Sequence, residues 1–497
     1  MNKIIGVEDA LSTRAQQEAR EGKRSIPAED LPFYADRVRV YPQRVKGTFR
    51  RLKWAVLGVL LAIYYLVPWI RWDRGPGAPD QAVLVDLTQQ RLYFFWIEIW
   101  PQEIYYIMGL LILAAVGLFL VTSLAGRVWC GYACPQTVWT DLFMWVERLI
   151  EGDRTKRIRL DKGKLTAGKA VKKVTKHGIW LIISLLTGGA WIMYFLDAPS
   201  LVANIVTGEI AMITAFFIGL FTATTYLLAG WAREQVCTYM CPWPRFQAAM
   251  FDEDTLIVTY RAWRGEKRAK HARNPDWSKR GDCVDCNACV AVCPTGIDIR
   301  DGQQLECISC ALCIDACNNI MDRVGRPRNL IAYDTIRNQS AGVAKMPIGH
   351  RMIRPRTVIY SAILAAVSAA MLVTIALRTN LEINVLHDRS PLFVRLSDGG
   401  IRNGYTIKIL NKQRTTRTFS LAVKGLKGAR FQVVGQDGTT GTAIISATPD
   451  KVSSYTIYLT MPSKALTSAR TEISFVLIDS RTGEVATHSS FFSAPRN

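Results

Sequence analysis

The chain has 497 residues, 49% hydrophobic composition and a formal net charge of +21. This length allows several domains, and this composition excludes both an intrinsically disordered chain and a fibrous protein. A large positive charge predicts nucleic acid or an anionic membrane surface as the partner, depending on where the charges lie. Here they flank long apolar segments, which predicts a membrane partner and no nucleic acid.

Five apolar runs are each long enough to cross a bilayer, whose apolar core requires about 20 helical residues. The second run, IMGLLILAAVGLFLVTSLAG, contains no charged residue, which distinguishes it from the buried core helices of a large soluble protein. The sequence therefore predicts a polytopic α-helical bundle. Its spans are expected near Trp54–Ile70, Ile104–Leu124, Ile179–Leu196, Ile210–Trp231 and Val358–Leu377.

The segments that flank and connect these runs are alternately rich and poor in Lys and Arg. The segments before the first span, between the second and third, and between the fourth and fifth hold 12, 12 and 19 of them, whereas loops 71–103 and 197–209 hold three and none. Because cationic loops stay on the cytoplasmic side, we expect the N-terminus inside and the C-terminal tail outside. The predicted units are a cytoplasmic N-terminal segment at 1–52, a membrane domain at 53–231 with a cytoplasmic loop at 125–177, a cytoplasmic segment at 232–356 and a fifth span at 357–378.

Two short motifs repeat the phrase Cys-x-Tyr-x-Cys-Pro. WCGYACPQTVW follows the second predicted span, and VCTYMCPWPRFQ follows the fourth. Both spans run toward the cytoplasm, so the membrane core is predicted to be a duplicated helical hairpin whose two thiol pairs meet at the cytoplasmic membrane surface. The four thiols are Cys130, Cys134, Cys237 and Cys241.

Several chemistries suit these thiol pairs. Cysteines four residues apart share one face of a helix, and Pro135 favours a new helix that Cys134 would cap, with a lowered thiol pKa. Soft thiolates favour Cu(I), with zinc, a further iron–sulfur cluster, a reversible disulfide or simple packing as alternatives. A structural disulfide is disfavoured on the reducing side of the membrane. We therefore predict the four thiols as a candidate copper and catalytic site.

The strongest signal is a double run, GDCVDCNACVAVCPTG followed by LECISCALCIDACNN. The spacing C-x2-C-x2-C-x3-C is typical of bacterial ferredoxins, in which the fourth cysteine of each run binds the other cluster, whereas zinc ribbons use widely separated pairs. Asn318 replaces the Pro expected after the second run. We expect an α+β 2[4Fe-4S] ferredoxin-like domain at about 275–325. The predicted ligand sets are Cys283, Cys286, Cys289 and Cys317 for cluster 1, and Cys307, Cys310, Cys313 and Cys293 for cluster 2.

Other redox modules are not indicated. The sequence has no G-x-G-x-x-G after a strand for a dinucleotide and no C-x-x-C-H for covalent haem. The clusters must therefore exchange electrons with another molecule, and we expect a cytoplasmic electron donor.

The tail at 385–497 alternates polar and apolar residues between short turns, which predicts an all-β immunoglobulin-like sandwich. It lacks the cysteine pair of antibody domains. His387 and His488 are more typical of an ordinary surface than of a metal site. We expect this domain to dock a partner protein.

The combined motifs resemble the cytochrome c oxidase accessory proteins of the CcoG family, also called FixG or RdxA. The resemblance covers nearly the whole chain. It implies a multi-pass protein of the bacterial inner membrane, with a periplasmic C-terminal domain, that supports assembly of cbb3-type cytochrome c oxidase. It also implies a cupric reductase that carries two [4Fe-4S] clusters and works with copper-handling proteins and oxidase subunits.

Three functions remain open at this point. The first is reduction of Cu(II) to Cu(I) at the thiol pairs, and the second is a respiratory relay to quinone or a partner enzyme with structural thiol pairs. The third is a scaffold that binds oxidase subunits, although a scaffold alone does not explain eight cluster ligands. The electron donor, the fate of Cu(I) and the oligomeric state are not predicted.

Overall fold

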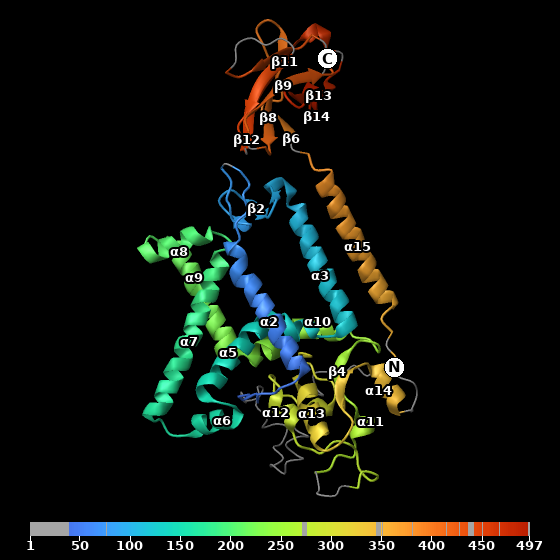
Figure 1. Ribbon diagram of the computed structural model, residues 1–497. Coiled ribbons are helices and arrows are strands. Elements are labelled where there is room, and N and C mark those ends of the chain that lie inside the picture. Colours follow the sequence, from blue (N-terminus) through green and yellow to red (C-terminus); the bar gives the residue numbers. More distant parts are fainter. Residues whose placement is uncertain are drawn as a thin grey trace, which may run out of the picture.

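The computed structural model describes residues 39–75, 77–270, 276–343, 349, 351–379, 381–413, 415–426, 428–435, 442–449, 451–466 and 468–495. Most of the predicted N-terminal segment at 1–52 lies outside these residues. The molecule is elongated (Figure 1). An all-β body lies at one end, the cysteine-rich segment lies at the other, and long helices run between them.

Four helical segments are long and apolar enough to cross a membrane, and at most 17% of the apolar window of each is buried. Apolar helices with such exposed sides suit a lipid environment, so the prediction of a membrane protein holds. The segments are Thr48–Trp69, Pro101–Ala125, Met212–Ala232 and Pro355–Ala376. Their α-helical parts are α2 (Thr48–Leu66), α3 (Tyr105–Ala125), α9 (Met212–Thr225) and α15 (Pro355–Ala376).

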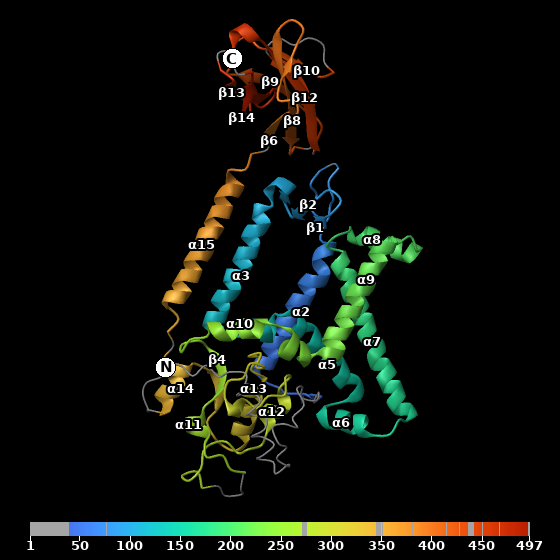
Figure 2. The ribbon, with the colours of Figure 1, turned by 180° about the vertical axis from the view of Figure 1, so that it is seen from behind.

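The third predicted span differs from the other four. It overlaps the second half of α7 (Ala167–Ile192) and extends four residues beyond it, and the first turns of α7 carry lysines such as Lys169 and Lys173. α7 is not among the four candidate spans, so the count of five stays a prediction. α7 packs closely along α9. The helices approach so closely that a Cβ at Gly188 would lie 2.8 Å from the carbonyl oxygen of Ile218. Seen from behind in Figure 2, α15 runs beside α3, and α7 and α9 form a second pair on the other side of α2.

Short helices lie near the ends of these long ones. They are α4 (Val128–Tyr132), α5 (Pro135–Glu151), α6 (Arg154–Lys162), α8 (Ala198–Thr207) and α10 (Trp243–Met250). α6 begins where the Asp153 side chain accepts a hydrogen bond from the Arg154 N–H, and α8 ends at Gly208, whose φ of 78° is left-handed. α5 and α10 follow the two Cys-x-Tyr-x-Cys-Pro motifs, which places both motifs at the same end of the bundle (Figure 1).

A small antiparallel sheet lies at the opposite end of the bundle. It consists of β1 (Val83–Asp86), β2 (Arg91–Phe94) and β3 (Ile97–Ile99), in that order. Just after it, buried Glu103 accepts hydrogen bonds from the Arg378 guanidinium at 2.7 Å and from Lys412 Nζ at 2.8 Å. Because Arg378 follows α15 and Lys412 belongs to the C-terminal body, these ion pairs hold that body against loop 71–103.

The cysteine-rich segment is an α+β unit, as predicted. β4 (Ile257–Tyr260) pairs antiparallel with β5 (Ile331–Asp334), with Ile257 opposite Asp334. The short helices of this unit are α11 (Ala262–Gly265), α12 (Ala288–Val292), α13 (Leu312–Arg323) and α14 (Ile336–Val343). Residues such as Ile314, Met321 and Leu330 form its core together with cysteine side chains, so the fold encloses most of the thiols, whereas Cys286 is exposed.

The C-terminal body is a sandwich of two antiparallel sheets, which confirms the predicted all-β tail. One sheet has the order β10-β12-β8-β6, with β7 beside β8, and the other has the order β11-β9-β13-β14. Its strands are β6 (Leu381–His387), β7 (Val394–Arg395), β8 (Gly400–Asn411), β9 (Arg417–Lys424), β10 (Arg430–Val433), β11 (Thr442–Ala447), β12 (Lys451–Pro462), β13 (Arg470–Asp479) and β14 (Val485–Ser493). Fully buried side chains such as Tyr405, Phe419 and Phe475 fill the space between the sheets.

His387 is not the plain surface residue that we expected. It packs between the rings of Tyr405 and Phe491, with ring centroids 4.9 and 4.7 Å away, and its Nε2 forms a 2.8 Å hydrogen bond with Asn403 Oδ1. His488 lies on β14 and is half-buried. Neither histidine belongs to a cluster that holds a metal ion among the described residues.

Candidate functional site

The eight ferredoxin-type cysteines line two neighbouring cavities. One cavity is lined by Cys283, Cys286, Cys289 and Cys317. The other is lined by Cys293, Cys307, Cys310 and Cys313, together with Cys289. The two cavities thus group the thiols in the sets of the crossed ferredoxin pattern, and Cys289 lies in the wall between them.

The remaining walls of these cavities are mostly apolar, with side chains such as Ile299, Ile320 and Leu330, although Asn287 and Arg300 line one cavity and Thr295 lines the other. Thiol donors in an apolar enclosure are the surroundings that iron–sulfur clusters require. The residues present therefore fit two [4Fe-4S] clusters.

Both binding loops use the same unusual backbone turns. The residue before the second cysteine and the residue after it have left-handed φ values, 48° at Asp285 and 55° at Asn287, and 52° at Ser309 and 60° at Ala311. Non-glycine residues rarely adopt this conformation, and they do so mainly where function fixes the backbone. The turns let backbone N–H groups reach the sulfurs; for example, the Ser309 N–H donates to the Cys307 thiol.

Burial strongly affects the thiols of these cavities. It raises the pKa of Cys289, Cys307 and Cys317 to about 12, and backbone N–H groups only partly offset this rise. A thiol in these surroundings stays protonated unless a metal binds the sulfur and displaces the proton. The cysteines are therefore suited to hold a cluster and poorly suited to act as free nucleophiles.

The Cys-x-Tyr-x-Cys-Pro motifs have similar local structures. Cys130 lies in α4, and Cys237 lies in the π-helical turn Val236–Met240. Cys134 and Cys241 follow in extended conformation, with ψ of 128° and 121°, just before the two prolines. The helix breaks between the two cysteines of each motif, so the expected shared face of one continuous helix does not form.

The fold nevertheless brings the four thiols, here called the thiol quartet, close together. Burial raises the pKa of Cys237 to about 12, and the charges of Cys134, Cys130 and Cys241 raise it further. Burial and the charges of Cys134 and Cys241 likewise raise the pKa of Cys130, to about 11. The meeting of the two motifs at one place, expected from the duplicated hairpin, is therefore found.

The expected lowering of the Cys134 pKa is wrong. Cys134 occupies the N-cap position of α5 as predicted, but its sulfur accepts no capping hydrogen bond, and the Thr137 N–H donates to its carbonyl oxygen at 3.0 Å. Burial raises the pKa of the thiol by more than the nearby N–H groups of Thr137 and Gln136 lower it. The sequence identified the helix terminus but not the desolvation around it.

The quartet packs directly on the second cavity. A Cβ at Gly131, between Cys130 and Tyr132, would lie 2.7 Å from the Ile308 carbonyl oxygen and 3.0 Å from the Cys310 nitrogen. The Tyr132 hydroxyl donates to the Cys310 carbonyl oxygen at 3.3 Å. α4, which carries Cys130, is thus in direct contact with the backbone of the cluster loop.

Comparison with known proteins places the chain in a family. It is 50% identical over 493 residues to the nitrogen fixation protein FixG of Rhizobium meliloti, covering 93% of this chain and 94% of that protein. The chain belongs to the FixG/RdxA family. Two other members, RdxA and RdxB of Cereibacter sphaeroides, are 50% and 47% identical and cover 90% and 94% of this chain, and 95% and 98% of their own lengths.

Three family models match separate parts of this FixG/RdxA-family chain. A 4Fe-4S dicluster domain matches residues 232–336, a 4Fe-4S binding domain matches residues 107–152, and the "IG-like fold at C-terminal of FixG" matches residues 371–495. A crystal structure of a FixG-related protein from Vibrio parahaemolyticus is 26% identical, with a TM-score of 0.21, over 24% of this chain and 100% of that one. The family models and the cavities together identify an iron–sulfur electron-transfer protein with apolar membrane helices.

Sequence reasoning missed one cation of this FixG/RdxA-family site. Arg127 is buried beside both thiol groups, and its guanidinium donates to the carbonyl oxygens of Pro244 at 2.7 Å and Cys307 at 3.2 Å. It also interacts electrostatically with the thiols of Cys307 and Cys130. A charged residue that ends a long apolar run, directly before WCGYACP, was the available signal.

A second missed feature is a buried carboxylate that positions the second motif. Glu147 on α5 is 1% exposed and pairs with Arg157 at 2.8 Å, Lys176 at 3.4 Å and Arg233. Burial opposes its charge, but these cations, Arg233 foremost, lower its pKa to about 2. Because Arg233 comes shortly before Cys237, the network fixes that motif on α5.

The described residues contain no group of three His, Cys, Asp or Glu side chains that converges closely enough to hold a single metal ion. This applies to the quartet as well.

Proposed function

We propose that this protein reduces Cu(II) to Cu(I) at the thiol quartet and that the Cu(I) serves assembly of a cbb3-type cytochrome c oxidase. The observation that carries the proposal is the contact of Gly131 and Tyr132 with the loop of Cys310. It joins a soft-metal thiol site to an electron-transfer unit without an intervening layer of side chains.

The eight ferredoxin-type cysteines would hold two [4Fe-4S] clusters in the crossed sets lining the two cavities. When bound, the clusters supply one-electron transfer between a cytoplasmic donor and the quartet. The mostly apolar walls shield buried thiols such as Cys289 and Cys310 from water, and N–H groups of both loops stabilise the charge of Cys289 and Cys307. Arg127 fixes the segments that carry Cys130 and Cys307 relative to each other.

Copper is the substrate in this proposal. Cu(II) gains one electron and becomes Cu(I), which soft sulfur ligands retain. Cys241 is exposed, whereas the other three thiols are half-buried, so copper would enter at Cys241. Two thiols suffice for Cu(I), in keeping with the lack of a convergent three-ligand group among the described residues.

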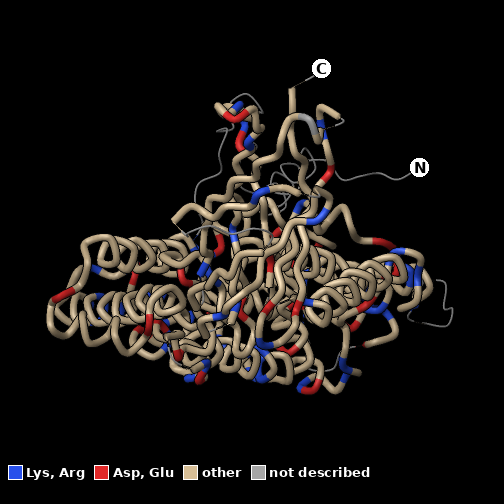
Figure 3. The backbone as a smooth tube through the Cα atoms, turned by 90° about the horizontal axis from the view of Figure 1, so that it is seen from above, with Lys and Arg blue, Asp and Glu red and all other residues tan. Residues whose placement is uncertain are grey.

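The proposed setting is the inner membrane of a bacterium, with several spans. The sandwich and the cysteine-rich unit lie at opposite ends of the helices (Figure 1), which supports opposite sides of the membrane for them. The basic residues whose distribution predicts a cytoplasmic cysteine-rich end are drawn in blue in Figure 3. The sandwich would then be periplasmic and available to oxidase subunits or copper-handling proteins.

The test uses the purified full-length protein, reduced without oxygen and mixed with Cu(II). Loss of the reduced-cluster absorption should coincide with Cu(I) captured by a chelator. Replacing all four quartet cysteines with serine should abolish copper reduction while iron content stays constant, and Thr238→Ser, within the second motif, should leave it unchanged. Unchanged copper reduction in the fourfold variant would overturn the proposal, and reoxidation by quinone alone would favour a respiratory relay.

A second occupant of the quartet is favoured by a specific observation. The matched 4Fe-4S binding region 107–152 contains only two cysteines, Cys130 and Cys134. The quartet would then hold a third iron–sulfur cluster that extends the electron path. Iron analysis distinguishes the two: about eight iron atoms per chain agree with copper at the quartet, and about twelve agree with a third [4Fe-4S] cluster.

A further inference from the structure

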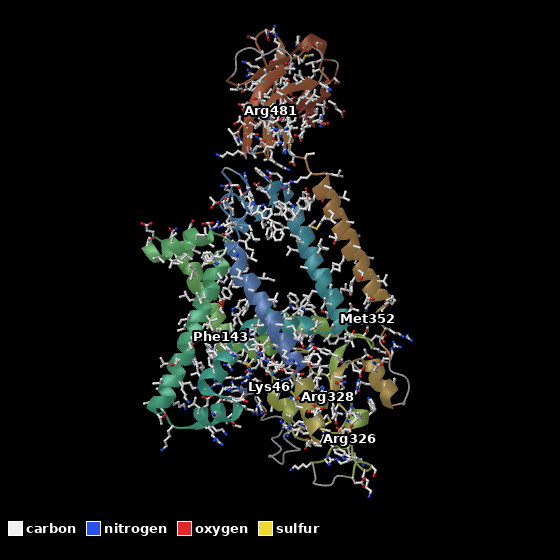
Figure 4. All side chains as sticks on the ribbon, viewed as in Figure 1. Lys46, Phe143, Arg326, Arg328, Met352 and Arg481 are labelled. Carbon is white, nitrogen blue, oxygen red and sulfur yellow. The ribbon has the colours of Figure 1, made fainter. Side chains whose placement is uncertain are left out.

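A cationic groove lies between the start of α2 and the end of α5, away from the thiols. It is open to solvent on one side. Figure 4 labels Lys46 at the lower end of α2, where the groove begins. The side chains that decide its chemistry are Arg44, Lys46, Arg51, Trp54, Trp145 and Arg148.

The groove contains more positive charge than the protein neutralises. Arg50, which also lines it, is paired with Asp141 at 2.8 Å. The lining includes no acidic residue, and no ion pair joins Arg44, Lys46, Arg51 or Arg148 to a carboxylate of the described part of the chain. These four cations therefore share a space whose lining holds no carboxylate, although Asp141 and Asp153 lie near enough to Arg148 to interact with its charge.

Arg148 shows the need for an anion most clearly. Its Nε is buried and has no hydrogen-bond partner among the described residues. Burial, together with the nearby charge of Arg50, lowers the pKa of Arg148 to about 10. A bound anion with oxygen acceptors would complete its hydrogen bonds and offset the repulsion between the guanidinium groups.

The position of the groove identifies the source of such an anion. It opens at the first turns of the candidate span Thr48–Trp69. The rings of Trp54 and Trp145 meet edge to face at 6.1 Å, and Trp145 and Leu149 are 45% and 69% exposed. Tryptophan and arginine side chains at the end of a span lie at the level of the lipid headgroups, and basic pockets there bind anionic headgroups.

We propose that this groove binds the phosphate of an anionic phospholipid, with Arg51 and Arg148 as its main ligands and the acyl chains beside Trp145 and Leu149. The site is independent of copper reduction. A soluble phosphate has the same acceptor oxygens but lacks the chains that the exposed apolar wall would cover.

Such a lipid would also steady the cluster-binding unit. Gly47, in the groove wall, lies so close to α13 that a Cβ there would be 2.1 Å from Asp315 Cγ. The Asp315 carboxylate accepts the N–H groups of Arg50 at 2.7 Å and Phe49 at 3.3 Å. Asp315 stands between Cys313 and Cys317, so a headgroup that fixes the start of α2 also fixes the helix that carries two cluster ligands.

The experiment compares lipid retention by the full-length protein in native mass spectrometry from detergent. Phosphatidylglycerol should be retained at least about tenfold better than phosphatidylcholine, and Arg51→Gln/Arg148→Gln should lose this preference, because each charge-assisted hydrogen bond changes affinity by about tenfold. The double variant Arg159→Gln/Lys162→Gln, with the same loss of charge on α6, should keep the preference. Millimolar inorganic phosphate should not displace the lipid.

Equal retention of both lipids, or full retention of phosphatidylglycerol by the groove variant, would overturn the proposal. Complete displacement by inorganic phosphate would also overturn it, in favour of a soluble anion site. Iron content reports whether the double variant has folded. Should it fail to fold, Arg148→Lys, which keeps the charge, should retain the lipid and Arg148→Gln alone should lose it; equal behaviour of these two variants would contradict the role of Arg148.

Discussion

Gly131 and Cys310 lie in backbone contact across two parts of the chain that are far apart in sequence. A Cβ at Gly131 would approach the nitrogen and Cα of Cys310 to 3.0 Å, a distance that side chains rarely tolerate. The thiol quartet therefore meets the second cluster cavity at a position where only glycine fits. This contact underlies the first prediction.

Gly131→Ala should push α4 away from the Cys310 loop. We expect the free energy of unfolding of the cysteine-rich unit to fall by about 1–3 kcal/mol, because overpacking generally destabilises a core by this amount. Copper reduction should also become slower. Thermal melting and the anaerobic copper assay measure the two effects. Gly117→Ala in α3 is the matched control, since a Cβ there meets no atom within 4 Å. Equal behaviour of both variants would contradict the close contact.

Cys293→Ser tests the crossed ligand sets. Cys293 belongs by sequence to the first run, but it lines the cavity of Cys307, Cys310 and Cys313. Its replacement should remove the same electron paramagnetic resonance signal as Cys307→Ser and leave the signal that Cys283→Ser removes. A spectrum like that of Cys283→Ser would show that each run binds its own cluster.

Arg127→Gln should shift a redox potential. A nearby positive charge stabilises the reduced, more negative state of a cluster, so its removal should lower the midpoint potential on the order of 50 mV for the cluster nearest Cys307. Redox titration followed by electron paramagnetic resonance measures this shift. Arg245→Gln, an exposed arginine on α10, should change neither potential. If both variants behave like the unchanged protein, Arg127 has no electrostatic role.

Glu147→Gln should destabilise the protein by about 3–5 kcal/mol, because it leaves buried Arg157, Lys176 and Arg233 without their shared anion. The native pKa of about 2 lies below the ordinary 4.5, so the ion pairs contribute fully above pH 4.5 and are lost as the pH falls toward 2. The variant should therefore melt below the unchanged protein by nearly the same amount at pH 7 and at pH 5.5. If the two proteins melted at the same temperature at pH 5.5, the pKa of Glu147 in the folded protein would have to be much higher than 2.

Much of the architecture is fixed by local sequence patterns. Uncharged runs such as 107–126 predict membrane helices because a bilayer requires apolar length, and the alternation in the tail predicts a sandwich because strand side chains alternate between two faces. The thiol spacing groups the eight cysteines in the same sets as the cavities do. These features depend on residues near one another in sequence.

The bounds of α7 and the pKa of Cys134 show where this reasoning is limited. The predicted span Ile179–Leu196 overlaps the second half of α7, but the helix starts earlier, at Ala167, and ends at Ile192. The Cys134 pKa is raised because burial, which depends on the whole fold, outweighs the effect of the N–H groups at the start of α5.

The sequence by itself determined the class of chemistry: two thiol runs for clusters, two further thiol pairs, apolar helices and an all-β tail. Only the tertiary structure decided which thiols share a cavity wall, that Gly131 meets Cys310, and that Arg127 and Glu147 are buried beside the motifs. It also decided that four cations share a groove at the start of α2. Spacing along a chain limits which atoms can meet, but the burial, desolvation and contacts that tune them arise between segments far apart in sequence.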